Sequence, residues 1–149
     1  MTPAVEAARS AGIEFTLHEY DGVEVGVGDY ARSVAAALGR PEGQLFKTLI
    51  VSVDGDLRAF VVPADRHLDL RSVGKRAQLA DKTQAERATG YVIGGISPLG
   101  QRRRLATVVD ESALEWPTIL VSAGRRGLQI ELRPVDLVAL TGATVTKAS

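Results

Sequence analysis

Cysteine is absent from this 149-residue sequence, and histidine occurs only 2 times. The lack of cysteine excludes disulfides, thiolate zinc sites, CxxC redox chemistry and a cysteine nucleophile. A histidine-rich metal site is nearly excluded as well, because at most two imidazoles could serve as ligands. If the protein is an enzyme, its chemistry must come from lysine, hydroxyl, carboxylate or backbone groups.

Neither sign of charge predominates, and long apolar runs are also missing. Lys+Arg 18 balances Asp+Glu 18, which argues against a wholly basic nucleic-acid coat or an acidic tail and leaves local patches open. No apolar run approaches the ~20 residues of a membrane span, and the start lacks a secretory signal, so we expect a cytoplasmic protein without a membrane partner. With 45% hydrophobic and 24% charged residues, the sequence is typical of one globular domain.

Apolar periodicity, capping residues and glycine stops predict a mixture of short helices and strands. Helices are expected over residues 3–11, 30–38, 69–80 and 134–140, and strands over 13–20, 45–53, 57–62, 91–93, 107–109, 118–121 and 128–132. Asp54-Gly55 predicts a tight hairpin, and residues 21–29 and 124–127 are expected as a loop and a turn. The expected fold class is α+β, with a compact, largely antiparallel or mixed sheet that is able to curl into a barrel and is flanked by short helices.

Lys47 stands in an apolar, β-prone run, where alternation places it on the same face as Leu45, Leu49 and Val51. An ammonium group on an apolar face is costly unless it is paired or faces a wet cavity. Lys47 is therefore a candidate for holding a phosphate or a developing oxyanion at the mouth of a pocket. The alternative is an edge-strand lysine whose ammonium group reaches out to water.

A glycine-rich loop, residues 94–100, follows the expected strand over 91–93. Its backbone N–H groups suit an anion-binding concavity, and a plain Gly/Pro turn explains the pattern equally well. No Lys-Ser or Lys-Thr pair follows the glycines, and Pro98 after Ser97 breaks the serine-hydrolase spacing, so the loop is neither type of catalytic motif. His18 and His67, the only possible bases for a Ser/His/Asp triad, lie in no recognisable motif and are expected on the surface.

Basic residues cluster despite the neutral total. Arg102, Arg103 and Arg104 follow the glycine loop directly, and Arg125 and Arg126 occupy the expected turn. Such clusters bind RNA phosphates in a salt-dependent way, and an ordinary solvated face explains them equally well. Aromatic content of 5% disfavours a base-stacking sheet of the RNA-recognition-motif kind.

Several short motifs occur together in an order that is typical of one known family. They are Thr2-Pro3-Ala4-Val5, Tyr20 at the end of the first strand, Phe46-Lys47-Thr48-Leu49, residues 89–101 around Gly-Gly-Ile-Ser-Pro-Leu-Gly, Val121-Ser122 and Arg126-Gly127-Leu128. Over nearly its whole length the sequence resembles the YbaK/EbsC branch of the bacterial prolyl-tRNA editing domains. The resemblance implies a single deacylase domain over 1–149 with a mixed β-barrel flanked by helices, and it implies no metal and no organic cofactor.

The same resemblance implies that the protein clears mischarged tRNA in trans, chiefly cysteine esterified to proline tRNA, in a transient complex with prolyl-tRNA synthetase. In the family mechanism the substrate's own thiol attacks the ester carbonyl and forms a cyclic thiolactone, so the enzyme needs no nucleophile. Related branches clear alanine or other small residues such as serine. A non-catalytic module that binds tRNA ends or a synthetase is a further alternative, whereas the missing nucleophile elbow disfavours a small-molecule esterase.

Carried over position by position, the resemblance implies a site around the strand that holds Lys47. The catalytic candidates are Lys47, Thr48, Gly94 and Gly95, the substrate-binding candidates are Tyr20, Ser97, Ser122 and Gln129, and the basic clusters named above are candidates for binding tRNA. We expect the Gly94 and Gly95 amides to stabilise the oxyanion. Thr48 is expected opposite to Lys47 unless a bulge or twist redirects it. Gln129 stands where the family often has an aspartate, which weakens the expectation of cysteine specificity and leaves amide hydrogen bonding.

Overall fold

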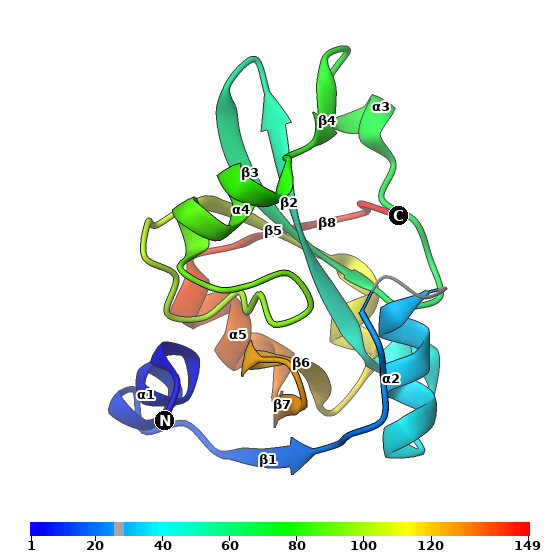
Figure 1. Cartoon of the computed structure of the whole chain (residues 1–149), viewed down its shortest axis with the longest axis vertical. Coiled ribbons are helices and arrows are strands. Elements are labelled where there is room, and N and C mark those ends of the chain that lie inside the picture. Colours follow the sequence, from blue (N-terminus) through cyan, green and yellow to red (C-terminus); the bar gives the residue numbers. More distant parts are fainter. Residues whose placement is uncertain (26–28) are drawn as a thin grey trace.

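Two open β-sheets form the centre of the computed structural model, which describes residues 1–25 and 29–149 (Figure 1). The smaller sheet is antiparallel and has the order β1-β7-β6, with β1 at Phe15–Glu19, β6 at Ile119–Arg125 and β7 at Leu128–Leu132. The larger sheet has the order β4-β2-β3-β5-β8, with β2 at Phe46–Val53, β3 at Asp56–Pro63, β4 at Ala77–Leu79, β5 at Ala106–Asp110 and β8 at Thr144–Thr146. Its β3–β5 and β5–β8 pairs are parallel. The α+β class is confirmed, and the described residues form no closed barrel.

Short helices flank the sheets. They are α1 at Pro3–Ser10, α2 at Tyr30–Leu38, α3 at Leu70–Val73, α4 at Lys82–Thr89 and α5 at Pro134–Thr141, with 3₁₀ turns at Glu42–Gln44 and Glu111–Glu115. The α2 helix begins after Asp29, whose carboxylate accepts a hydrogen bond from the Arg32 amide, and this cap places Tyr30 in the first turn. Within the described residues, none of the helices has the length and apolarity to cross a bilayer. The middle of the expected 21–29 loop, residues 26–28, lies outside the described residues.

The main hydrophobic core lies between the two sheets. Alternate residues of the larger sheet face alternate residues of the smaller one, and the members of this set include Phe46, Ile50, Ala59, Val61, Ile119, Val121, Ile130 and Leu132. The sheets also meet directly where Leu45 forms an isolated parallel bridge with Leu120. This bridge fixes the start of β2 against β6.

The helix expected over residues 69–80 is confirmed only in its first part. The α3 helix ends at Val73, and after Gly74 the chain extends into β4, which pairs with residues 51–53 of β2. The apolar spacing is compatible with a helix, but the edge of β2 offers backbone hydrogen bonds that a local pattern does not reveal.

The strand expected over residues 91–93 is wrong, because the chain turns there and the Gly95 amide donates to the Val92 carbonyl oxygen at 2.8 Å. The α4 helix and the β8 strand were not among the expected elements. A capping box between Asp81 and Gln84 is the sequence signal for α4.

The edge of β2 that faces away from β3 is only partly covered. The β4 strand pairs with residues 51–53, and no strand of the described chain pairs with residues 46–50 on that side. On this edge the Ala80 amide donates to the Ile50 carbonyl oxygen at 2.9 Å. In an antiparallel strand every second residue directs its N–H and C=O groups to the same side, so those of Thr48 point to this edge as well. The open part of the edge is where the functional site lies.

Candidate functional site

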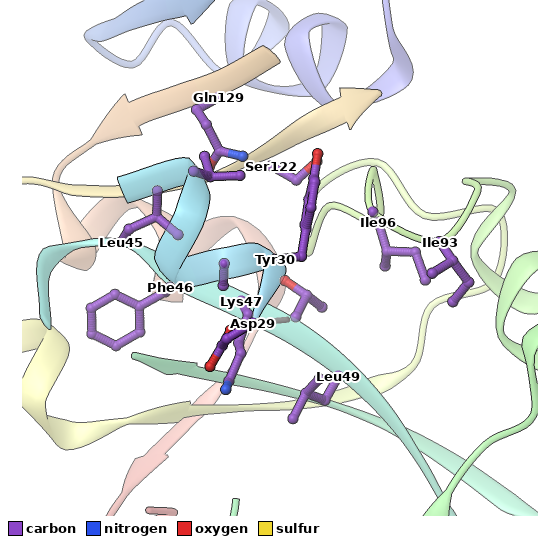
Figure 2. A pocket seen from close by; sticks show the side chains of 14 residues that line it. Asp29, Tyr30, Leu45, Phe46, Lys47, Leu49, Ile93, Ile96, Ser122 and Gln129 are labelled. Carbon is purple, nitrogen blue, oxygen red and sulfur yellow. The ribbon is translucent and has the colours of Figure 1, made fainter. Parts of the chain in front are cut away.

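A cavity of about 250 Å³ opens at the free edge of β2 (Figure 2). Its walls come from β2, the first turns of α2, the loop after α4, and strands β6 and β7. The apolar lining residues are Ala31, Val34, Leu45, Phe46, Leu49, Ile93 and Ile96, and the others are Asp29, Tyr30, Lys47, Thr48, Gly94, Ser122 and Gln129. Lys47 and Asp29 lie at one end of the view, and Ser122 and Gln129 lie at the other with the Tyr30 hydroxyl directed toward them. The site therefore has one charged end and one neutral polar end.

Lys47 and Thr48 both line the cavity although they are consecutive residues of one strand. The β2–β3 pairing runs from Phe46 to Val53 without a register shift, so no bulge redirects Thr48. Both side chains reach the cavity because it lies at the open edge of the strand, where both faces of β2 border it. In the described part of the chain no carboxylate lies within 4.0 Å of the Lys47 ammonium group, which leaves its charge available to an anion.

Neutral hydrogen-bonding groups line the other end. Gln129 is 4% exposed, its Nε2 lies 3.5 Å from the Tyr20 hydroxyl oxygen, and that oxygen lies 3.0 Å from the Tyr30 hydroxyl. Ser122 Oγ accepts from the Gly124 amide and keeps its own proton free to donate. Among the described residues, Gln129 Oε1 has no hydrogen-bond partner although it is buried. A buried orphan oxygen at the wall of a cavity is a natural contact for a ligand.

Gly94 and Ile96 are the residues of the glycine loop that line the cavity, and the Gly94 N–H donates to no acceptor among the described residues. Gly95 and Ser97 do not line the cavity. The Gly95 amide is occupied within its own turn, so its expected role at the oxyanion needs correction. Ser97 is fully buried, and its Oγ accepts from the Leu99 amide at 3.2 Å. Its place is within the loop rather than against a substrate.

Residues 27–140 match the family described as the aminoacyl-tRNA editing domain. The chain belongs to this family. It is 38% identical over 118 residues to the protein named "Putative Cys-tRNA(Pro)/Cys-tRNA(Cys) deacylase EbsC" from Enterococcus faecalis, with 74% of this chain and 71% of the relative covered. Aminoacyl-tRNA editing is accordingly the function of the domain.

Solved structures confirm the fold of this editing domain. The crystal structure of the hypothetical protein APE2540 matches it with a TM-score of 0.85 and 28% identity, over 98% of both chains. The crystal structure of "a putative trans-editing enzyme for prolyl tRNA synthetase" matches with a TM-score of 0.80 and 26% identity, over 100% of this chain and 98% of that one. The family inferred from the motifs is confirmed, and so is the α+β fold with its flanking helices, whereas the two sheets form no closed barrel in the described residues.

The two basic clusters of the editing domain lie in different places. Arg126 is not itself a lining residue, but it lies beside two of them: its Nε donates to the Ile93 carbonyl oxygen at 2.8 Å, and its side chain packs beside Gly94. Arg125 is exposed next to it. Residues 102–104 are exposed, and none of them lines the cavity. If both clusters bind tRNA, they contact separate parts of it.

A polar network holds the C-terminal end of α2 against the smaller sheet of the editing domain. Glu131 of β7 accepts hydrogen bonds from Arg40 at 2.9 and 3.1 Å and from Thr118 at 2.6 Å, and it lies 2.8 Å from His18 Nε2. Burial by itself raises the pKa of Glu131, but the hydrogen bonds from Thr118, Arg40 and His18 together lower it to about 2. His18 therefore belongs to this network, which corrects its expected surface role, whereas His67 is exposed as expected.

Asp29 and Tyr30 are polar lining residues that sequence reasoning missed. A helix over residues 30–38 was expected, but nothing in the sequence indicates that the hydroxyl of Tyr30 meets that of Tyr20, ten residues earlier. Tyr20, a predicted binding residue, contacts Tyr30 and Gln129 and is not itself among the lining residues.

Proposed function

We propose that this editing domain deacylates Cys-tRNA(Pro) in trans, with the thiol of the substrate as the nucleophile. The names of the EbsC relative and of the trans-editing enzyme support this substrate and a link to prolyl-tRNA synthetase. The observation that carries the proposal is the make-up of the cavity. Lys47 and Gly94 line a mostly apolar hollow, and no histidine is among its lining residues. Among the described residues, the hydroxyls of Thr48 and Ser122 form no hydrogen bond with a histidine or a carboxylate, so they suit binding better than attack.

The proposed reaction needs no protein nucleophile. The cysteine sulfur attacks the carbonyl carbon of its own ester, which forms a carbon–sulfur bond and a tetrahedral oxyanion. Collapse breaks the bond to the ribose oxygen, which takes up the proton lost by the thiol and leaves as the free 3′ end of the tRNA. The other product is a four-membered thiolactone. Because ring closure is intramolecular, the cavity has to hold the reacting conformation and stabilise the developing charge.

The size of the cavity fits the end of the tRNA. At about 250 Å³ it lies just below the ~300–1,000 Å³ of typical ligand pockets, so it suits the aminoacyl group rather than a whole nucleotide. Lys47, at the charged end, is placed for a phosphate of the terminal adenosine. The net charge of +0 gives the domain little general attraction for tRNA, and a transient complex with the synthetase in the cytoplasm would supply the selection of proline tRNA.

Deacylation of a panel of charged proline tRNAs tests the proposal. We expect rapid release from Cys-tRNA(Pro), and slow release from Ala-, Ser- and S-methylcysteinyl-tRNA(Pro), in which the thiol is absent or blocked. Equal rates for cysteine and S-methylcysteine would show that water is the nucleophile and would overturn the thiolactone mechanism. Tight binding of all four without release of any amino acid would favour the alternative, a module that binds tRNA ends.

A further inference from the structure

We propose that the Tyr30 hydroxyl is the second hydrogen-bond donor to the oxyanion, beside the Gly94 amide. The inference rests on the deacylase function proposed above. Side-chain hydroxyls of tyrosine serve in oxyanion sites alongside backbone amides. A second donor is needed because the Gly95 amide is already bound within its own turn.

The position of Tyr30 suits this role. It lines the cavity from the first turn of α2, and Gly94 lines the same cavity from the loop after α4. Figure 2 shows its ring standing in the wall of the cavity, with the hydroxyl directed toward the end that holds Ser122 and Gln129. Arg126 packs beside Gly94, the other proposed donor.

A chain of hydrogen bonds links Gln129 to Tyr30 through Tyr20. Gln129 Nε2 donates to the Tyr20 oxygen at 3.5 Å. The Tyr20 and Tyr30 hydroxyls lie 3.0 Å apart, and either one can donate to the other. The proposed role requires that Tyr20 donates, which leaves the Tyr30 proton for the oxyanion in the cavity. Tyr20 is accordingly a positioning residue that acts through Tyr30.

The protonation state of Tyr30 is the one that a hydrogen-bond donor needs. Burial raises the pKa of Tyr30 above the ordinary value for tyrosine, the charge interaction with Tyr20 raises it further, and the smaller opposing effect of Arg126 does not reverse this. The phenol is therefore neutral at physiological pH and keeps a proton to donate. As negative charge grows on the ester oxygen, this hydrogen bond strengthens, so its contribution belongs to kcat rather than to KM.

The test is steady-state deacylation of Cys-tRNA(Pro) by Tyr30→Phe, which removes only the hydroxyl. We expect kcat to fall about 100-fold, with KM within about threefold of wild type and an unchanged melting temperature. Tyr20→Phe should lower kcat less, and it should add nothing in a Tyr30→Phe background, because it acts through Tyr30. A Tyr30→Phe kcat within twofold of wild type, or additive losses in the double variant, would overturn the inference.

The third tyrosine provides a matched control. The Tyr91 hydroxyl is buried against the Leu99 and Gly100 carbonyl oxygens and does not line the cavity. Tyr91→Phe should therefore lower the melting temperature and leave kcat close to wild type, the reverse of Tyr30→Phe.

A binding measurement tests this inference separately from the proposed function. The probe is an adenosine 3′-phosphonate whose anionic tetrahedral centre mimics the oxyanion, and its affinity is measured for wild type and Tyr30→Phe. At least a tenfold weaker affinity of the variant supports Tyr30 as a donor even if cysteine is not the preferred substrate, and equal affinities contradict it. If wild type neither releases any amino acid nor binds the probe, both the proposed function and the inference fail.

Discussion

Lys47 and Thr48 point to opposite faces of β2 and nevertheless line the same cavity. Thr48 shares its face with Phe46 and Ile50 of the main core, and Lys47 shares its face with Val51 in a separate cluster. The cavity reaches both because β4 leaves this part of the strand edge uncovered. An open edge thus brings an ammonium group and a hydroxyl group together without a bulge.

Replacement of Lys47 by alanine should lower kcat/KM for deacylation about 100-fold, because the cavity loses its only lining cation among the described residues. The melting temperature should stay within ~2 °C of wild type, since the ammonium group makes no ion pair in the described chain and surface changes of this kind are nearly neutral. Lys75→Ala, in the exposed turn after α3, is the control with the same charge change. Full activity of Lys47→Ala would remove Lys47 from the mechanism.

Thr48→Val should make the domain more stable and less active. Thr48 Oγ1 is buried without a hydrogen-bond partner among the described residues, and valine has the same shape without the hydroxyl. Removing an unsatisfied buried group should raise the free energy of unfolding by about 1 kcal/mol. If the hydroxyl binds substrate, kcat/KM should fall at least tenfold in the same variant. A loss of stability in urea titration would show that the hydroxyl has a structural partner instead.

Gly95→Ala should destabilise the fold far more than Gly12→Ala. A Cβ at Gly95 would lie 2.8 to 2.9 Å from backbone atoms of Arg125 and Arg126, which cannot move independently of the β6–β7 turn. At Gly12 the left-handed φ of +70 is strained for alanine, but nothing lies within 4 Å. We expect losses of about 3 kcal/mol and about 1 kcal/mol, respectively, from urea unfolding. Similar losses would mean that the turn yields to the methyl group.

The sequence predicts well what depends on local pattern. Asp54-Gly55 forms the expected turn between β2 and β3, and Asp54 adopts the positive φ of 52 that such a turn requires. The tight approach of Gly95 to the β6–β7 turn explains why the loop carries a glycine there, although the sequence suggested an oxyanion role. Glycine is preferred both where two distant backbones pack closely and where a free amide faces a ligand. The sequence alone therefore does not separate these two roles.

Features that depend on partners distant in the chain were not predictable. Residues 77–79 become a strand because the edge of β2 is available, and His18 is drawn into a network by Glu131, 113 residues later. The link between Tyr20 and Tyr30 likewise depends on a contact between the residue that follows β1 and the first residue of α2. Periodicity reports which face of an element is apolar, but it does not report what lies opposite that face.

The Glu131 network predicts a specific loss of stability in acid. The pKa of Glu131 is about 2 in the folded state and 4.5 ordinarily, so the unfolded chain binds the proton more readily. Its contribution is therefore fully present above pH 4.5 and is lost as the pH falls toward 2. Glu131→Gln should lower the free energy of unfolding at pH 7 by about 2 kcal/mol and should flatten its decline between pH 5 and pH 2. Glu14→Gln, at an exposed position, is the control and should leave the profile unchanged.

Because the two basic clusters lie apart, replacing an arginine of each should change the binding of a short RNA and of full tRNA differently. Arg126 lies beside the cavity, so Arg126→Ala should weaken binding both of full tRNA and of a short RNA that carries only the 3′ end. Arg103→Ala, away from the cavity, should weaken binding of full tRNA alone. Each change should reduce the slope of log K against log salt by about 0.7 to 0.9 if it removes one phosphate contact. Arg133→Ala has the same charge change at an arginine already paired with Asp136 and should leave the slope unaltered. Weaker binding of the short RNA by Arg103→Ala would show instead that the two clusters act on one part of the tRNA.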